Sequence, residues 1–267
     1  MGISELRQAA VARRSEVRGQ ETEVRSQRSE FSAARVRYDL LVFAAFAMLL
    51  LFILLTRAVL WEWAPLAEWD RVCCERLHQH GRTAPSLVAF LQAFTYLAST
   101  RMLFLETTLI ALMLAVCRHW RLALAWMTSI CTGYLLVHVL KAVVGKPRPV
   151  FPDPFEFPIN GSFPSGHTAG AVLVFGLLAY LLARFWPNRR WASYAGCSAL
   201  ILAIGFSRVY LGAHWFSDVV GGIVIGMACN LVAIAVMERV KERNPPTPFS
   251  KTEGGAVISP IPLRERG

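Results

Sequence analysis

Three short clusters of polar residues interrupt an otherwise apolar chain, and their side chains are of the kinds that bind and cleave a phosphate ester. In chain order the clusters are Lys141 with Arg148; Ser165, Gly166 and His167; and Arg208, His214 and Asp218. Cations neutralise the charge that a phosphate ester carries, and guanidinium groups offer it planar pairs of donors. Histidine can act as nucleophile or as general acid. These residues therefore predict a site that holds a phosphate group and breaks its ester bond.

The spacing within the clusters supports this chemistry. His214 and Asp218 are four residues apart, so on one helix they share a face, and the carboxylate can hold the imidazole tautomer that leaves the other ring nitrogen free to attack phosphorus. Ser165 and Gly166 precede an apolar run, where the free N–H groups of a helix start favour an anion. The simpler interpretation, that Ser165 is only an N-cap, is compatible with this role.

The clusters together form a recognisable pattern. Written as motifs they are Lys141-x6-Arg148-Pro149, Pro164-Ser165-Gly166-His167 and Ser207-Arg208-x5-His214-x3-Asp218. This pattern resembles the type 2 phosphatidic acid phosphatase superfamily, which includes membrane lipid phosphate phosphatases and soluble vanadium haloperoxidases. The resemblance extends over about residues 101–237. It implies that His214 is a nucleophile that forms a phosphohistidine, that Asp218 orients it, and that His167 is the general acid.

Six apolar runs can position these clusters. With 55% hydrophobic residues and a mean hydropathy of +0.42, the chain is too apolar for an ordinary soluble domain. A bilayer core takes about 20 apolar residues per helix. The runs are 40–60, 102–117, 121–140, 168–183, 192–206 and 215–237; the second is short and could extend back through 94–97. If each run crosses once, all three clusters lie on the same membrane face.

The predicted fold is therefore an all-α integral membrane bundle of six transmembrane helices, with short interfacial helices between the first two. We divide the chain into a charged N-terminal segment (1–38), a six-span phosphatase domain (39–237) and a flexible tail (238–267). Because 38 polar residues precede the first run, we expect an uncleaved anchor rather than a signal peptide. Gly222 and Gly226 in the last run predict close approach of helices within the subunit.

The positive charges predict the orientation. Of the 28 Lys and Arg residues, 19 fall on the face that carries both termini and 9 on the face that carries the clusters. The positive-inside rule places the termini in the cytoplasm, so the active site of this inner (plasma) membrane protein would face the periplasm or the outside. The net charge of +10 also favours anionic lipid. A nucleic-acid partner is disfavoured, because the spans divide the basic residues.

Two further residues are candidates for a substrate pocket. Glu106 lies inside the second run, where it could line the pocket or pair with Arg101. Phe163 closes a loop rich in proline and phenylalanine, and it could contact an acyl or isoprenoid chain; burial against the membrane is the alternative. The carboxylates near the clusters, Asp153, Glu156 and Asp218, are too few for a two-metal centre, so no metal or other cofactor is expected.

The resemblance and the topology together predict an enzyme that hydrolyses a phosphomonoester or diphosphate of a lipid. The outward site favours undecaprenyl diphosphate, with phosphatidylglycerophosphate, phosphatidate or a lipid A phosphate as alternatives. Two other functions stay open: transfer of the phosphoryl group to another lipid, and non-catalytic lipid binding or transport on the same fold. A vanadium haloperoxidase is disfavoured, because those relatives are soluble.

Overall fold

The computed structural model of the 267-residue chain describes residue 32 and residues 35–152, 154–155 and 161–242. Over these residues the ordered structure is helical, with no β-strand. The first helix, Arg35–Leu60, is followed by α2 (Ala64–Thr83), α3 (Pro85–Thr95), η1 (Tyr96–Ala98), α4 (Thr100–Val116), α5 (Trp120–Val144), α6 (Gly166–Ala171), η2 (Val172–Gly176), α7 (Leu177–Phe185), η3 (Pro187–Arg189), α8 (Arg190–Tyr210) and α9 (Phe216–Glu242). The predicted N-terminal segment and tail lie outside the described residues, apart from the helical residues 32, 35–38 and 238–242.

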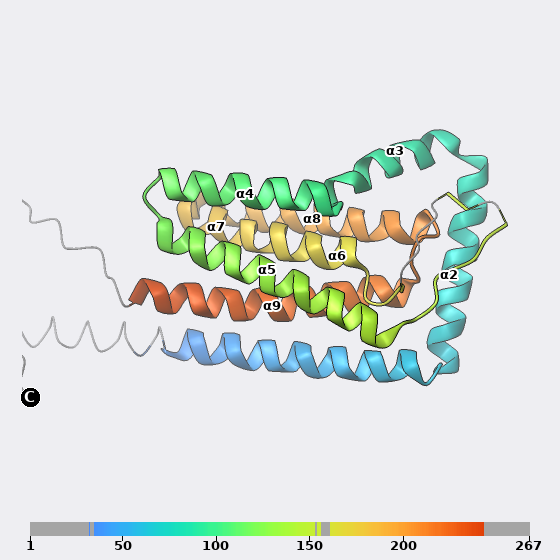
Figure 1. Cartoon of the computed structure of the whole chain (residues 1–267), viewed down its shortest axis with the longest axis horizontal. Helices are drawn as coiled ribbons and strands as arrows, with labels where there is room; N and C mark the ends of the chain where they lie inside the picture. The colour runs from blue at the N-terminus through green and yellow to red at the C-terminus, as the bar shows by residue number, and fades with distance from the viewer. Residues whose placement is uncertain (1–31, 33–34, 153, 156–160, 243–267) are drawn as a thin grey trace, which may run out of the picture.

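The long helices run side by side as a bundle, and α2 lies across one end of it (Figure 1). Five helices are long and apolar enough to cross a membrane: 35–60, 120–144, 166–185, 187–210 and 216–239. Helix α3 with η1 and helix α4 would add a sixth span, bent by 46°. The all-helical membrane architecture predicted from the sequence is confirmed, with five or six candidate spans.

The bend before α4 has a local cause. Ser99 is extended (φ −67°, ψ 152°), and its hydroxyl accepts a hydrogen bond from the backbone N–H of Met102 at 3.4 Å, which makes it the N-cap of α4. Helix α3 begins with Pro85, which is favoured at a first helical position because it has no N–H to leave unpaired there. The predicted second span is thus divided between two helices.

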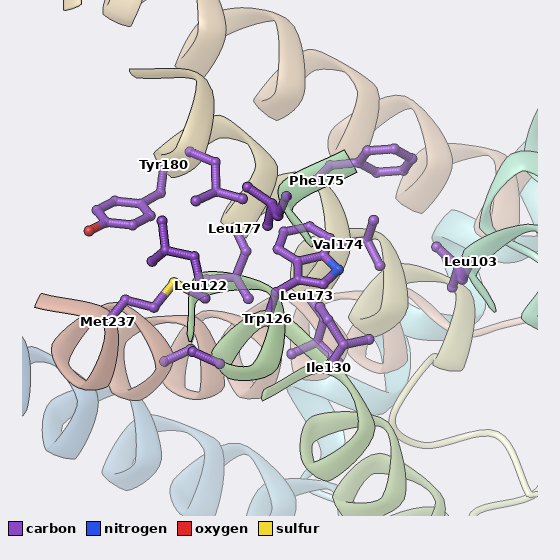
Figure 2. Close-up of a cluster of buried hydrophobic side chains, with 14 of the residues drawn as sticks. Leu103, Leu122, Trp126, Ile130, Leu173, Val174, Phe175, Leu177, Tyr180 and Met237 are labelled. Carbon is purple, nitrogen blue, oxygen red and sulfur yellow. The ribbon is translucent and has the colours of Figure 1, made fainter. Parts of the chain in front are cut away.

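The centre of the bundle is a close-packed apolar core (Figure 2). Trp126 of α5 is fully buried, and its indole N–H donates to the carbonyl of Thr107 in α4 at 3.1 Å. A Cβ at Gly133 would come within 2.7 Å of Leu173, so the small residue lets the helix that begins at Gly166 approach α5 closely. By contrast, the first helix exposes apolar side chains such as Phe43 and Phe46, as expected for a surface that faces lipid.

Helix α9 lies directly against the start of α6, as the small residues Gly222 and Gly226 predicted. A Cβ at Gly222 would lie 2.8 Å from the carbonyl oxygen of Ser165, and one at Gly226 would lie 2.8 Å from Cβ of Val172. Such contacts are too short for any residue larger than glycine. This packing brings the first turn of α9 beside the first turn of α6, at the end of the bundle that α2 crosses (Figure 1).

Candidate active site

The three motif clusters meet at one end of the bundle, although the sequence separates them by up to 77 residues. Lys141 lies in the last turn of α5 and Arg208 in the last turn of α8. His167 lies in the first turn of α6, and the charges of Lys141, Arg148, Arg208 and His214 all act on its ring. The structure therefore brings both predicted histidines and all three predicted cations into one site.

His214 lies in the short connection between α8 and α9 and is fully buried. Its Nδ1 is 3.3 Å from Oδ2 of Asp218, one turn away in α9. The same oxygen accepts hydrogen bonds from the Ser162 hydroxyl at 2.5 Å and from the backbone N–H of Trp215 at 2.9 Å. Burial lowers the pKa of His214 to about 3, although Asp218 acts in the opposite direction. The imidazole is therefore neutral at physiological pH and keeps a lone pair for attack.

Arg148 determines which ring nitrogen carries that lone pair. One terminal guanidinium nitrogen, NH1, lies 3.0 Å from Nε2 of His214 and 2.6 Å from the carbonyl oxygen of Ala213. Arginine only donates hydrogen bonds, so Nε2 must be the acceptor and the ring proton must lie on Nδ1, facing Asp218. From these partners we infer the tautomer whose Nε2 is directed to the cationic side of the site.

The start of α6 provides backbone donors. Ser165 is the N-cap: its hydroxyl oxygen accepts from the N–H of Thr168 at 3.5 Å, and its own N–H donates to the carbonyl of Asp218 at 2.9 Å. At Gly166 a Cβ would meet no atom within 4 Å, so there is open space beside the Cα of this residue. Helix N-termini favour anions in such a space.

Lys141 and Arg208 complete the cationic side, and both are buried. The Lys141 ammonium donates to the carbonyl oxygen of Gly161 at 3.0 Å, which ties α5 to the loop before α6. One guanidinium nitrogen of Arg208 lies 3.4 Å from the hydroxyl of Thr95 in α3. Buried cations favour an anionic ligand, because the ligand restores the charge balance that desolvation has made costly.

The two predicted pocket residues, Phe163 and Glu106, have different surroundings. Phe163 is fully buried, and its ring stacks on Phe52 of the first helix at a centroid distance of 5.7 Å, which is a packing contact. Glu106 is half-buried in α4 with one carboxylate oxygen that has no partner among the described residues. Among the described residues it forms no ion pair with the exposed Arg101. A substrate pocket at either residue stays a prediction.

Sequence reasoning missed a set of residues behind Asp218. The set comprises Asp70 and Cys74 of α2, Lys146 and Ser162 of the loop before α6, and Ser217 of α9. Lys146 lies 3.2 Å from Oδ1 of Asp218, and the Cys74 thiol donates to the carbonyl of His214 at 3.3 Å. Burial and the nearby negative charges of Asp70 and Asp218 raise the pKa of Cys74 to about 12, so the thiol keeps its proton. The available signal in the sequence is that Asp70 and Cys74 are four residues apart, so on a helix they share one face.

In chemical terms, the site combines a neutral imidazole, whose Nε2 faces a cation, with a second histidine at the start of a helix. The described residues contain no group of His, Cys, Asp and Glu side chains that could hold a metal ion. The arrangement suits nucleophilic attack on an anionic phosphorus centre.

Comparison with known proteins agrees with the motifs. Residues 122–242 match the model of the PAP2 superfamily. Phosphatidylglycerophosphatase B of Bacillus subtilis (strain 168) is 34% identical over 113 residues, which are 41% of this chain and 55% of that protein. Lipid A 1-phosphatase of Rhizobium johnstonii is 33% identical over 129 residues, 45% of this chain and 49% of that protein. This chain thus spans about half the length of the curated relatives that it matches.

A solved structure is similar over a larger part of the chain. The crystal structure of a transmembrane PAP2-type phosphatidylglycerolphosphate phosphatase from Bacillus subtilis matches with a TM-score of 0.69 and 25% identity. The match covers 76% of this chain and 100% of that structure. The resemblance stated from the three motifs is confirmed.

Proposed function

With residues 122–242 in the PAP2 superfamily, we propose that this chain is a membrane lipid phosphatase that works through a phosphohistidine on His214. The observation that carries the proposal is the pair of contacts of the His214 ring. Nδ1 is held by Asp218 at 3.3 Å, and Nε2 is directed at Arg148, 3.0 Å away, among the site's cations. A buried neutral imidazole held in this way is a competent nucleophile.

The reaction follows from these positions. When a phosphate binds, the Arg148 guanidinium donates to its oxygens in place of Nε2, which frees the Nε2 lone pair. Nε2 attacks phosphorus, the bond from phosphorus to the leaving oxygen breaks, and His167 gives that oxygen its proton. The phosphorylated ring is positive, because Nδ1 keeps its hydrogen, and Asp218 stabilises this charge. Water then attacks phosphorus and gives a proton to His167, the N–P bond breaks, and inorganic phosphate leaves. Lys141, Arg148 and Arg208 neutralise the non-bridging oxygens in both steps.

The substrate class follows from the place of the site in the bundle. An anionic head group can reach the cationic end while its apolar chain stays beside the exposed apolar helices. The relatives named above act on phosphatidylglycerophosphate and on lipid A 1-phosphate, as their names state. We therefore assign a lipid phosphomonoester or diphosphate as substrate, with undecaprenyl diphosphate, phosphatidylglycerophosphate and phosphatidate as the compounds to test.

The path of the chain supports six membrane crossings. The first helix ends at the α2 end of the bundle and α5 begins at the opposite end, so α4 must carry the chain back (Figure 1). Helix α4 has 17 residues and is about 25 Å long, slightly short of a bilayer core, and the bent α3 segment can supply the rest. The distribution of Lys and Arg then supports an active site outside the cytoplasm.

This orientation is testable on intact cells. In a background with all six cysteines replaced by Ser, a Glu62→Cys variant should react with a membrane-impermeant maleimide, because residue 62 joins the first helix to α2 at the site end of the bundle. A second variant that keeps only Cys117, which follows α4 at the opposite end, should stay unlabelled. Labelling of Cys117 alone would reverse the orientation.

The test of function is release of inorganic phosphate from the three lipids by purified protein in detergent. Wild type is compared with His214→Ala and with His119→Ala, which removes an exposed histidine at the far end of the bundle. We expect His214→Ala to be inactive and His119→Ala to match wild type. A radiolabelled phosphate on the protein should be acid-labile, alkali-stable and absent from His214→Ala. An active His214→Ala would refute the mechanism, and a phosphorylated lipid product without inorganic phosphate would show phosphotransfer.

A further inference from the structure

An ion cluster of Asp70, Lys146 and Asp218 lies beside His214, and the proposed mechanism uses only Asp218 of these three. The ammonium of Lys146 donates hydrogen bonds to Asp70 Oδ2 at 2.8 Å and to Ser217 Oγ at 2.7 Å. It also forms an ion pair with Asp218 Oδ1, 3.2 Å away. Lys146 therefore joins two carboxylates, one from α2 and one from α9.

Asp70 is held tightly in this cluster. Its Oδ1 accepts from the backbone N–H of Ser217 at 2.7 Å, and its Oδ2 accepts from the Ser217 hydroxyl at 2.6 Å as well as from Lys146. The side chain is buried, at 7% relative exposure. One turn further along α2, Cys74 donates to the carbonyl of His214. One face of α2 thus contacts both the backbone of the catalytic histidine and Ser217, the residue before Asp218.

The charges of the cluster leave one negative charge beside His214. Two carboxylates share a single ammonium, so the sum over Asp70, Lys146 and Asp218 is −1. The His214 ring becomes positive when Nε2 bonds to phosphorus and Nδ1 keeps its proton. If Asp70 were neutral, Lys146 would pair with Asp218 alone and cancel the charge that faces the ring. In a buried site this loss of negative charge strongly destabilises the positive ring, because water screens the interaction little.

We propose that Asp70 is a positioning residue for the phosphatase reaction, which draws Lys146 away from Asp218 so that the Asp218 charge serves His214. This inference rests on the proposed function. Asp70 and Lys146 do not touch the substrate; they act through Asp218. Removal of Asp70 should therefore slow the chemical step and leave substrate binding unchanged.

A double-mutant cycle tests this. Asp70→Asn, Lys146→Met and the double variant are compared with wild type by phosphate release from dioctanoyl phosphatidate in detergent micelles. The control is Glu75→Gln, which removes an exposed carboxylate of α2 that pairs with Arg71 at 3.0 Å. We expect Asp70→Asn to lower kcat about 10–100-fold, the range seen when outer-shell partners of metal-ligating histidines are removed, with KM unchanged. The double variant should recover most of kcat, because no ammonium remains to compete for Asp218. Glu75→Gln should match wild type.

The same proteins are titrated with orthovanadate, a phosphate analogue that can bond to the ring nitrogen. Vanadate affinity should fall in Asp70→Asn and return in the double variant. A folded double variant as slow as Asp70→Asn, or an Asp70→Asn variant that changes KM and not kcat, would overturn the proposal. If Asp70→Asn does not fold, the double variant is the test. The proposal requires the double variant to fold and to hydrolyse the lipid at close to the wild-type rate. If the proteins bind vanadate with the expected order of affinities but the wild type hydrolyses no lipid, the proposed function alone is refuted.

Discussion

Asp218→Asn is the most direct test of how the site orients its nucleophile. The amide has the shape of the carboxylate but offers one acceptor oxygen and two N–H donors. Around the native side chain, Oδ2 receives hydrogen bonds from Ser162, Trp215 and His214, and Oδ1 faces Lys146 at 3.2 Å. Every group that surrounds this carboxylate is thus a donor.

The magnitude follows from that environment. If the amide oxygen replaces Oδ2, the new NH2 group faces the ammonium of Lys146; if the amide is flipped, the NH2 group faces three donors. Either orientation leaves a buried donor without an acceptor, which costs about 1–3 kcal/mol of folding stability. The His214 ring also loses the partner that keeps its proton on Nδ1. In a Ser-His-Asp triad the equivalent change lowers kcat roughly ten-thousandfold, which is about 5 kcal/mol of barrier.

The assay is phosphate release from a short-chain phosphatidate, with thermal melting in detergent to show that the variant is folded. The matched control is Glu68→Gln, which replaces an exposed carboxylate of α2 that pairs with Arg71 at 2.7 Å. We expect the control to keep wild-type activity and a wild-type Tm. A folded Asp218→Asn variant with activity within tenfold of wild type would show that the carboxylate does not orient His214.

Three further predictions concern the acid, the metal and the pH dependence. His167→Ala should lose about 10²–10⁴ in rate on an alkyl phosphate and much less on a nitrophenyl phosphate, whose leaving group needs no proton; equal losses would contradict the general-acid role. Dialysis against EDTA should leave activity unchanged, and a loss reversed by added Mg²⁺ or Zn²⁺ would show that a metal is required. Because burial lowers the pKa of native His214 to about 3 against an ordinary value of 6.5, the unfolded chain binds a proton in this window that the native protein does not. Stability should therefore fall as pH drops below about 6.5, and Tm should fall less between pH 7 and pH 5 in His214→Gln than in wild type; equal shifts would contradict this.

The sequence predicts that the three clusters converge, because this convergence depends only on the alternating direction of consecutive spans. Consecutive spans run in opposite directions, so Lys141 at the end of one helix and His167 at the start of the next must lie at the same end of the bundle. The geometry within each cluster is also local. His214 and Asp218 meet because they are one turn apart, and Ser165 caps α6 because its hydroxyl reaches the N–H three residues on.

Contacts that depend on the rotation of a helix about its axis could not be predicted in this way. Asp70 meets Ser217 across 147 residues and Lys146 across 76. Nothing local determines which face of α2 turns inward. Phe163 shows the same limit: its place beside a motif fits a ring in the substrate pocket or in the core, and the stack on Phe52 depends on where the first helix packs.

Helix α2 shows why the polar contacts matter more than its amphipathic pattern. A helix that lies on a membrane surface buries its apolar face in the lipid. The buried residues of α2 are instead Asp70, Cys74, His78 and Gly81, while Trp69 is exposed. Three of the four are one turn apart, and their face lies against the residues that hold His214. Burial of Asp70 is favourable only because Ser217 and Lys146 satisfy its oxygens. Helix α2 can therefore dock across the end of the bundle only where these partners exist, which couples its position to the correct assembly of the active site.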